Sequence, residues 1–231
     1  MSRLNLNKNA SFLPAALTGV LFWLIVFAAA AGAEMPPLSE TVGRLQQIYE
    51  RTQDFQANFV QETTVKSIRK TEVEEGVVYF KSPRQMLWDY KKPKAKKLII
   101  NAQKAWLYLP QDKTAYTQDA DRLFKSEALI KFLSGLGKLT EDFTLRYATP
   151  AATDRKGDYL LQLYPREKGA SYAYLQMTLD KDSFQILEVS FDDVMGNTTR
   201  LKFSAIKMNA GLSSKLFQFQ PPAGVSIFKM P

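Results

Sequence analysis

The residue types that most often carry enzyme chemistry are missing from this sequence. Its 231 residues include no histidine and no cysteine, which excludes nucleophile–base pairs built on imidazole or thiolate. The same absence removes the usual ligands of zinc, copper and haem. No glycine-rich phosphate loop follows a strand pattern, and no G-x-S-x-G motif occurs. We therefore expect no enzymatic activity, no cofactor and no bound metal.

Carboxylates are the acid–base groups that remain. Asp192-Asp193 and Glu74-Glu75 are adjacent pairs in segments with a strand pattern, and neighbouring residues of a strand point to opposite faces. Neither pair therefore predicts two cooperating carboxylates. A hydrolase of cell-wall glycan with two distant carboxylates stays open as an alternative, and it would need the two groups within about 5–10 Å of each other.

The N-terminal segment has the pattern of a secretory signal peptide. Arg3 and Lys8 precede an apolar run over residues 13–31, and Ala31-Gly32-Ala33 provides small residues at a cleavage site. We expect cleavage after Ala33 and export to the periplasm, with residues 34–231 as one domain. An uncleaved membrane anchor is the alternative, because the run is nearly long enough to span a bilayer. No cysteine ends the signal peptide, so we expect a protein that is not itself lipid-anchored.

The net charge of +8 favours anionic partners, but the basic residues are mostly scattered. The exception is residues 91–97, with the sequence Lys-Lys-Pro-Lys-Ala-Lys-Lys. This cluster could contact nucleic acid or acidic lipid headgroups. We favour a solvated loop between two strands and expect no nucleic-acid partner.

The segment 34–51 is predicted to form a helix. Its helical turns begin after Pro36 and Pro37, and Ser39 is a plausible N-cap. Its apolar residues recur at helical spacing: Leu38, Val42, Leu45, Ile48 and Tyr49. A second, short and strongly apolar helix is predicted at residues 126–136. Its apolar side includes Leu129, Ile130, Phe132 and Leu133.

From residue 54 onward the apolar period changes to two, which is typical of strands. Turn residues separate the segments, so we expect an antiparallel meander that closes toward a barrel or a sandwich. No flexible linker or repeat divides it. The predicted strands are 54–61, 73–81, 85–90, 97–101, 104–109, 113–118, 142–148, 157–164, 172–180, 184–193 and 197–208.

Several predicted strands carry large apolar residues on both faces. Met86, Trp88 and Tyr90 share one face of residues 85–90, and Trp106 and Tyr108 share one face of residues 104–109. A sheet with one solvated face should instead alternate between apolar and polar residues. One face could therefore pack against helices while the other surrounds a ligand, although the pattern alone does not separate a cavity from a dry core.

Several short motifs, taken in order, resemble the periplasmic outer-membrane lipoprotein carrier family, LolA. The resemblance covers essentially the whole chain after residue 33. The segment 54–61 matches an F-x-A-x-F-x-Q strand, and residues 216–225 match F-x-F-x-P-P-x-G-V. The other matching pieces are Glu75-Gly76-Val77-Val78-Tyr79-Phe80-Lys81-Ser82-Pro83, Trp88-Asp89-Tyr90, Pro93 and Ala105-Trp106-Leu107-Tyr108.

The resemblance implies an α+β fold that is mostly β: an incomplete antiparallel β-barrel of about eleven strands with an α-helical lid. It implies a monomeric carrier that receives acylated lipoproteins from an inner-membrane ABC transporter (LolCDE-like). The carrier would deliver them to an outer-membrane receptor (LolB-like). A relative on the same fold that binds free lipid or senses lipoproteins is the alternative.

We expect one apolar face of the barrel to bind the acyl chains. The residues expected there are Phe80, Met86, Trp88, Leu98, Ile100, Trp106 and Tyr108. The helix 126–136 would act as the lid over them, through Leu129, Ile130, Phe132 and Leu133. The family commonly has an arginine before the proline of its second strand, which resembles a latch for the lid. Ser82 stands there, so Ser82 and the nearby Arg84 are the latch candidates.

Overall fold

The computed structural model describes residues 35–122, 138–167 and 170–230. The predicted cleavage site and the predicted helix 126–136 lie outside these ranges. The chain divides into two units, residues 1–35 and 36–231, and the description below concerns the second. Among the described residues, no helix is both long enough and apolar enough to cross a membrane.

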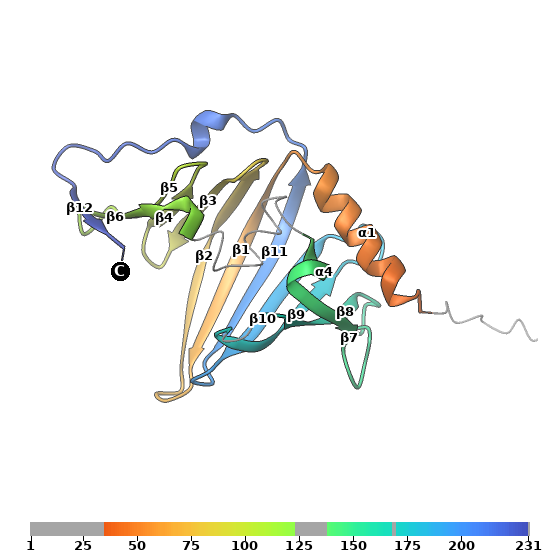
Figure 1. The fold of residues 1–231 in the computed structure, drawn as a ribbon. Helices are drawn as coiled ribbons and strands as arrows, with labels where there is room; N and C mark the ends of the chain where they lie inside the picture. The colour runs from red at the N-terminus through yellow and green to blue at the C-terminus, as the bar shows by residue number, and fades with distance from the viewer. Residues whose placement is uncertain (1–34, 123–137, 168–169, 231) are drawn as a thin grey trace, which may run out of the picture. The chain divides into compact units, whose positions relative to one another are not determined.

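Twelve strands form one sheet in this unit (Figure 1). Their order across the sheet is β12-β6-β5-β4-β3-β2-β1-β11-β10-β9-β8-β7. The strands are β1 (Asp54–Val65), β2 (Lys70–Lys81), β3 (Gln85–Lys92), β4 (Lys96–Ile100), β5 (Lys104–Leu109), β6 (Thr114–Asp119), β7 (Phe143–Tyr147), β8 (Tyr159–Pro165), β9 (Tyr172–Leu179), β10 (Ile186–Asp193), β11 (Thr198–Met208) and β12 (Ser226–Lys229).

The sheet consists of two antiparallel meanders that meet at one strand pair. Strands β1 to β6 follow one another, as do β7 to β11, and β1 pairs with β11. The last strand, β12, adds to β6 in parallel. Strands β12 and β7 are the two ends of the strand order and are not paired with each other. The predicted fold class, a mostly β incomplete barrel with few helices, is confirmed.

Helix α1 (Leu38–Arg51) packs its apolar side against the sheet. Val42, Leu45 and Tyr49 are buried, as the helical spacing predicted. The N-cap is Pro37 rather than the predicted Ser39. The carbonyl of Pro37, which has extended backbone, accepts the first helical hydrogen bond from the Thr41 amide at 3.2 Å, so Ser39 already lies inside the first turn.

Several elements depart from the sequence-based prediction. Strand β1 continues past residue 61 and strand β2 begins before residue 73, so their hairpin is longer than predicted. The added residues are mostly polar and show no apolar alternation. The short helices α4 (Leu139–Asp142) and η1 (Ser214–Phe217) were not predicted. Neither was β12, which is exposed along its whole length. Such an edge strand forms by backbone pairing and needs no apolar pattern.

The main core lies on one face of the sheet, where α1 and α4 contribute Leu45 and Leu139. A second, smaller cluster lies on the opposite face. There the C-terminal segment covers β2 to β5 with Phe217, which is 1% exposed. Figure 1 shows this segment in blue, running from the end of β11 back to β12. Both faces of the first meander are therefore covered, which explains its apolar residues on both sides.

The basic cluster at residues 91–97 spans the end of β3, a three-residue connection and the start of β4. Its lysines lie beside carboxylates. Lys91 Nζ is 2.6 Å from Asp89, and Lys96 Nζ is 2.7 Å from Glu74. Since these ion pairs offset much of the positive charge, the geometry favours the solvated strand connection over an anion-binding surface.

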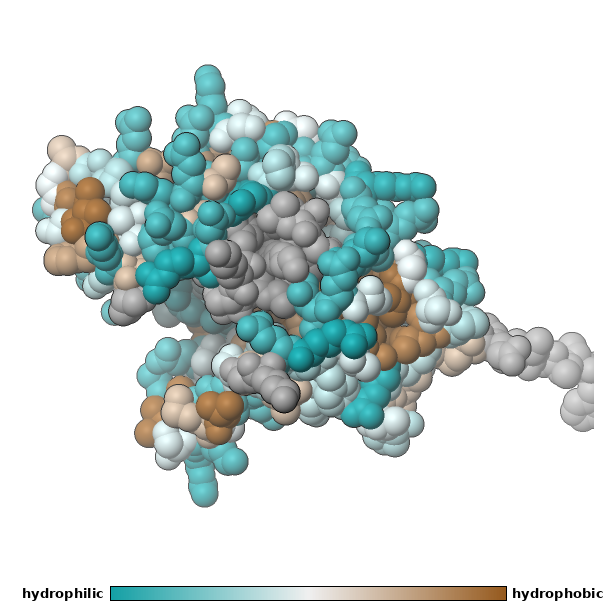
Figure 2. Space-filling model, in the orientation of Figure 1, coloured by the Kyte–Doolittle hydropathy of each residue, from teal (hydrophilic) through white to brown (hydrophobic). Residues whose placement is uncertain are grey.

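Apolar groups on the outside occur in separate patches. Figure 2 shows a largely hydrophilic surface where the residues are coloured, with a few brown areas. Among the described residues, the most exposed large apolar side chains are Ile68, Val194 and Met195, at the tips of the β1–β2 and β10–β11 hairpins. These exposed patches are small compared with the apolar cluster on the core face of the sheet.

Candidate functional site

The core face of the sheet contains a partly open cavity of about 210 Å³. Its walls come from α1 and from strands of both meanders. The residues that line it are Tyr49, Phe55, Ala57, Gln61, Val78, Met86, Trp88, Tyr90, Leu98, Ile186, Val189, Phe191, Leu201, Phe203 and Ile206. None of these described residues is charged. The lining can therefore bind apolar groups, and it offers no carboxylate for acid–base chemistry.

Strand register places these side chains together. On β1, Ala57 and Gln61 point to the same face because strand side chains alternate with a period of two. Ala57 is opposite Val78 of β2, and Gln61 is opposite Leu201 of β11. The pairing of β1 with β11 therefore places the apolar residues of the second meander beside those of the first, and together they line the cavity.

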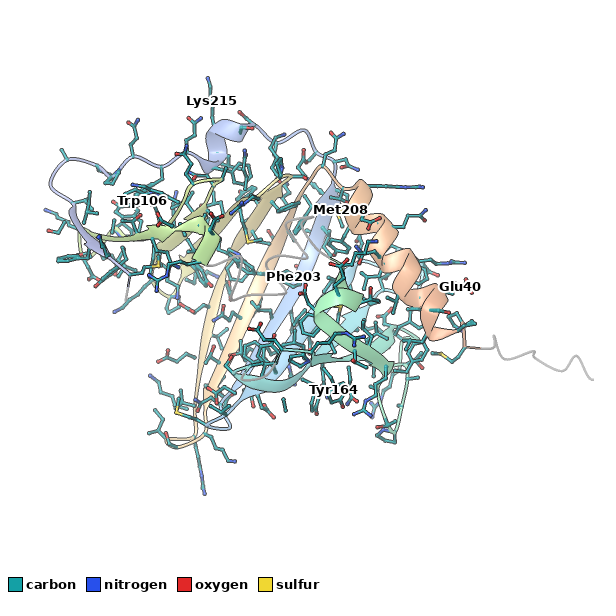
Figure 3. All side chains as sticks on the ribbon, in the orientation of Figure 1. Glu40, Trp106, Tyr164, Phe203, Met208 and Lys215 are labelled. Atoms are coloured by element: carbon teal, nitrogen blue, oxygen red, sulfur yellow. The ribbon has the colours of Figure 1, made fainter. Side chains whose placement is uncertain are left out.

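Aromatic rings form the middle of this wall. The ring of Phe59 meets Trp88 and Tyr90 edge to face, each at 4.9 Å between centroids. The ring centroid of Phe203 of β11, labelled in Figure 3, lies 6.3 Å from that of Trp88. Edge-to-face pairs at such distances add to the stabilisation that burial provides, so this part of the wall is well packed.

A polar network lies beside the apolar wall. The Tyr90 hydroxyl donates to Gln61 Oε1 at 3.1 Å. The Lys96 ammonium lies 4.2 Å above the Tyr90 ring, and it forms an ion pair with Glu74 at 2.7 Å. Burial, with a smaller contribution from Glu74, raises the pKa of Tyr90 to about 12. The Tyr90 hydroxyl is therefore protonated, and a donor, at neutral pH.

A second tyrosine hydroxyl is buried where α1 meets β10. The Tyr49 oxygen accepts a hydrogen bond from the Ile186 amide at 3.2 Å. Burial raises the pKa of Tyr49 well above its ordinary value, although the Ile186 hydrogen bond acts in the opposite direction. This tyrosine is thus a neutral anchor between helix and sheet, which fixes one end of the cavity.

The structure brings together some of the predicted cavity residues. Met86, Trp88 and Leu98 line the cavity. Phe80 and Ile100 are fully buried in the same core but are not part of the lining. These five residues share one face of the sheet, as the alternation predicted.

Trp106 and Tyr108 lie on the other face, away from the predicted cavity position. Trp106 is opposite Ile99, whereas the cavity residue Leu98 is opposite Leu107, and consecutive residues point to opposite faces. Both rings pack on Phe219 of the C-terminal segment, with centroids 5.5 and 5.1 Å apart. Trp106, labelled in Figure 3, therefore belongs to the smaller cluster.

The two latch candidates have different surroundings. Ser82 is exposed, and its amide donates to the Gln53 carbonyl at 2.7 Å. Arg84 forms an ion pair and hydrogen bond with Asp121, at the end of a described segment. The predicted lid residues, Leu129, Ile130, Phe132 and Leu133, lie outside the described residues.

The second half of the cavity was missed by sequence reasoning. Val189, Phe191, Leu201 and Phe203 all line it. The alternation within each of the two strands was a usable signal, because each pair shares one face. The pattern could not predict the β1–β11 pairing, which brings these strands to the first meander.

The fold and this cavity define a class of protein: a binding protein that encloses apolar groups on the core face of an incomplete barrel. The family model described as "Outer membrane lipoprotein carrier protein LolA" matches residues 50–220. The chain therefore belongs to the LolA family of outer-membrane lipoprotein carrier proteins.

Individual relatives agree with this assignment. The outer-membrane lipoprotein carrier protein of Methylococcus capsulatus is 29% identical over 207 residues, which cover 89% of this chain and 94% of the relative. The protein of that name from Pseudomonas aeruginosa PAO1 is 28% identical over 210 residues, which cover 89% of this chain and 97% of the relative.

A solved structure supports the fold alone. An uncharacterized conserved protein from Thermus thermophilus superimposes with a TM-score of 0.53 at 16% identity. The match covers 83% of this chain and 98% of that one.

Proposed function

We propose that this protein is a periplasmic chaperone that binds the acyl chains of lipoproteins released from the inner membrane and delivers them to the outer membrane. The observation that carries the proposal is the uncharged cavity, lined mostly by apolar side chains from both meanders, in a chain of the lipoprotein carrier family. The protein acts as a carrier without enzymatic activity.

The energetics of the cargo explain the need for a cavity. Each buried methylene is worth roughly 0.8 kcal/mol, so one long acyl chain costs on the order of 10 kcal/mol to expose to water. A lipoprotein with several chains would therefore not cross an aqueous compartment unprotected. The apolar side chains at Met86, Trp88 and Phe203 offer the chains an environment similar to the membrane interior.

Binding requires the cavity to widen. Its volume of about 210 Å³ is smaller than the roughly 300–1,000 Å³ typical of pockets for small ligands. Because β7 and β12 are not paired with each other, the sheet can change its curvature without breaking any strand pairing. An incomplete barrel therefore suits a carrier that must both enclose and release long chains.

The proposed route begins with export directed by residues 1–33, which are removed to give a single mature domain from residue 34. An inner-membrane ABC transporter for lipoprotein release loads the monomeric carrier, and an outer-membrane receptor unloads it. Arg84 serves as the latch of the lid segment 126–136, with Asp121 as its partner. Trp106 and Tyr108 are assigned to holding the C-terminal segment.

A binding experiment with two matched variants tests the proposal. A labelled synthetic triacylated lipopeptide should bind to the purified protein, and the same peptide without acyl chains should not. Leu201→Asp places a carboxylate at the cavity wall, where an unpaired charge is costly, so lipopeptide affinity should fall at least ten-fold. Leu216→Asp makes the same change in η1, outside the cavity, and should leave affinity unchanged. Equal binding of the two peptides would refute the carrier role.

A further inference from the structure

Gln61 interrupts the apolar pattern of β1 at the cavity wall. Phe55, Ala57 and Phe59 precede it on the same face, and all three are buried among apolar groups. Gln61 continues this inward register opposite Leu201 and lines the cavity. Gln61 is half-buried there, and an amide set against apolar groups needs hydrogen-bond partners to offset the loss of water. Its position therefore calls for a polar partner.

The network around Gln61 fixes the orientation of its amide. The Tyr90 hydroxyl donates to Gln61 Oε1 at 3.1 Å, so the amide oxygen is already engaged. The amide nitrogen, Nε2, donates to Thr63 Oγ1 over 3.4 Å. That distance exceeds the 2.7–3.2 Å of an ordinary N–H···O hydrogen bond. An amide nitrogen carries two N–H groups, so Nε2 has donor capacity beyond this long contact.

The charges beside Gln61 favour a neutral ligand group. Lys96 lies over the Tyr90 ring, and its charge is balanced by Glu74 at 2.7 Å. Gln61, Tyr90, Lys96 and Glu74 together thus carry no net charge. A free fatty acid would bring an unbalanced carboxylate to this place, whereas an ester carbonyl is a neutral acceptor that Nε2 can satisfy.

We infer that Gln61, oriented by Tyr90, is a hydrogen-bond donor site for the ester carbonyl oxygens that link acyl chains to the cargo. The inference rests on the proposed carrier function and adds the chemical group that this part of the wall recognises. The acyl chains lie along the apolar wall of Met86, Trp88 and Phe203. Their polar junction lies at Gln61. Tyr90 is a positioning residue in this arrangement, since its hydroxyl is committed to Gln61 Oε1.

The test compares two synthetic ligands on the full chain as expressed and purified. One is a triacylated lipopeptide with two ester-linked chains. The other is its dialkyl ether analogue, which keeps chain length but lacks those two carbonyl groups. Wild-type protein should bind the ester form about five-fold more tightly, the change that one net hydrogen bond makes. Gln61→Leu should lose this preference by weakening ester binding alone.

Control variants separate recognition from folding. Gln176→Leu makes the same change at an exposed position of β9 outside the cavity lining, and it should keep the five-fold preference. Gln61→Glu keeps the size and polarity of the side chain but replaces the donor with a carboxylate, so it should lose the preference even if Gln61→Leu does not fold.

The outcomes distinguish this inference from the proposed function. Equal, tight binding of the ester and ether forms by wild-type protein would overturn the ester site and leave the carrier role standing. A preserved preference in Gln61→Leu, or in Gln61→Glu if the leucine variant does not fold, would also overturn it. Binding of neither ligand by wild-type protein would refute the carrier role, and the ester site with it.

Discussion

The ring of Phe59 lies directly over the Cα of Gly76, its partner across the β1–β2 pair. A Cβ added at Gly76 would fall 2.9 Å from Phe59 Cε1 and Cζ, and 2.3 Å from the Asp89 carbonyl oxygen. The position therefore requires glycine. The Phe59 ring held there also packs on Trp88 and Tyr90 at the cavity wall, so this contact links sheet packing to the site.

Gly76→Ala should destabilise the fold. A methyl group forced into this contact must displace backbone or ring, and such overpacking costs about 1–3 kcal/mol. Urea unfolding followed by circular dichroism measures the free energy of unfolding. Gly43→Ala is the matched control, because nothing lies within 4 Å of that exposed helical position. It should stabilise by about 0.5–1 kcal/mol. Equal stability of Gly76→Ala and wild type would contradict the contact.

Alkaline pH should weaken the fold through the two buried tyrosines. The folded-state pKa of Tyr90 is raised to about 12 by burial, above its ordinary value of about 10. The stability that this shift provides is fully present below about pH 10 and is lost as pH rises toward 12, because the unfolded chain releases the proton first. Tyr49 acts in the same direction.

The corresponding measurement is the melting temperature between pH 9 and 12. Wild-type protein should lose stability with rising pH more steeply than Tyr90→Phe or Tyr49→Phe, since each variant lacks one titrating hydroxyl. The difference between the wild-type curve and each variant curve therefore reports the contribution of the missing hydroxyl. Parallel curves would show that these hydroxyls do not titrate as their burial requires.

The Arg84–Asp121 pair should matter more for transfer than for stability. Its side chains are 28% and 70% exposed, and ion pairs in such positions contribute at most about 1 kcal/mol. Arg84→Ala, Asp121→Ala and the double variant should therefore melt within a few degrees of wild type. If the pair is the latch, all three should change the rate of lipopeptide release to the same extent. Additive effects on that rate would mean that the two residues act separately.

Phe217→Ala should destabilise the protein without changing cargo affinity. Phe217 is 1% exposed and packs on Leu87 and Ile99, on the face opposite the cavity. Removing a buried phenylalanine ring costs about 3–5 kcal/mol. Phe228→Ala, at a side chain that is 52% exposed, should change stability by only about 0.5 kcal/mol. A large loss of lipopeptide affinity in folded Phe217→Ala would contradict the separation of the two clusters.

The alternation of apolar residues predicted most strands, because a residue buried on one face leaves a regular trace in the sequence. The pattern located β3 and β5 closely, and it placed Met86 and Trp88 correctly on one face. It did not find β12, since Ser226–Lys229 is exposed and is held by backbone pairing with β6. Hydrogen bonds between backbones leave no compositional signal.

The candidate site was only half predictable for a related reason. Alternation states which residues of one strand share a face, but not which strand is the neighbour. Trp106 looked equivalent to Trp88 until the β4–β5 register placed it opposite Ile99. Leu201 and Phe203 were not among the predicted cavity residues, and the pairing of β11 with β1 brings them to the cavity wall. Both errors concern pairing between segments, which depends on the whole fold.

The pairing of β1 with β11 also determines when the protein can begin to work. These strands are far apart in the chain, and pairing between distant segments forms slowly, because the entropy of closing a long loop must be overcome first. Each meander can assemble from local hairpins, but neither encloses the cavity alone. The proposed acyl binding therefore requires the complete sheet, because a molecule without the β1–β11 pair has only part of the cavity lining.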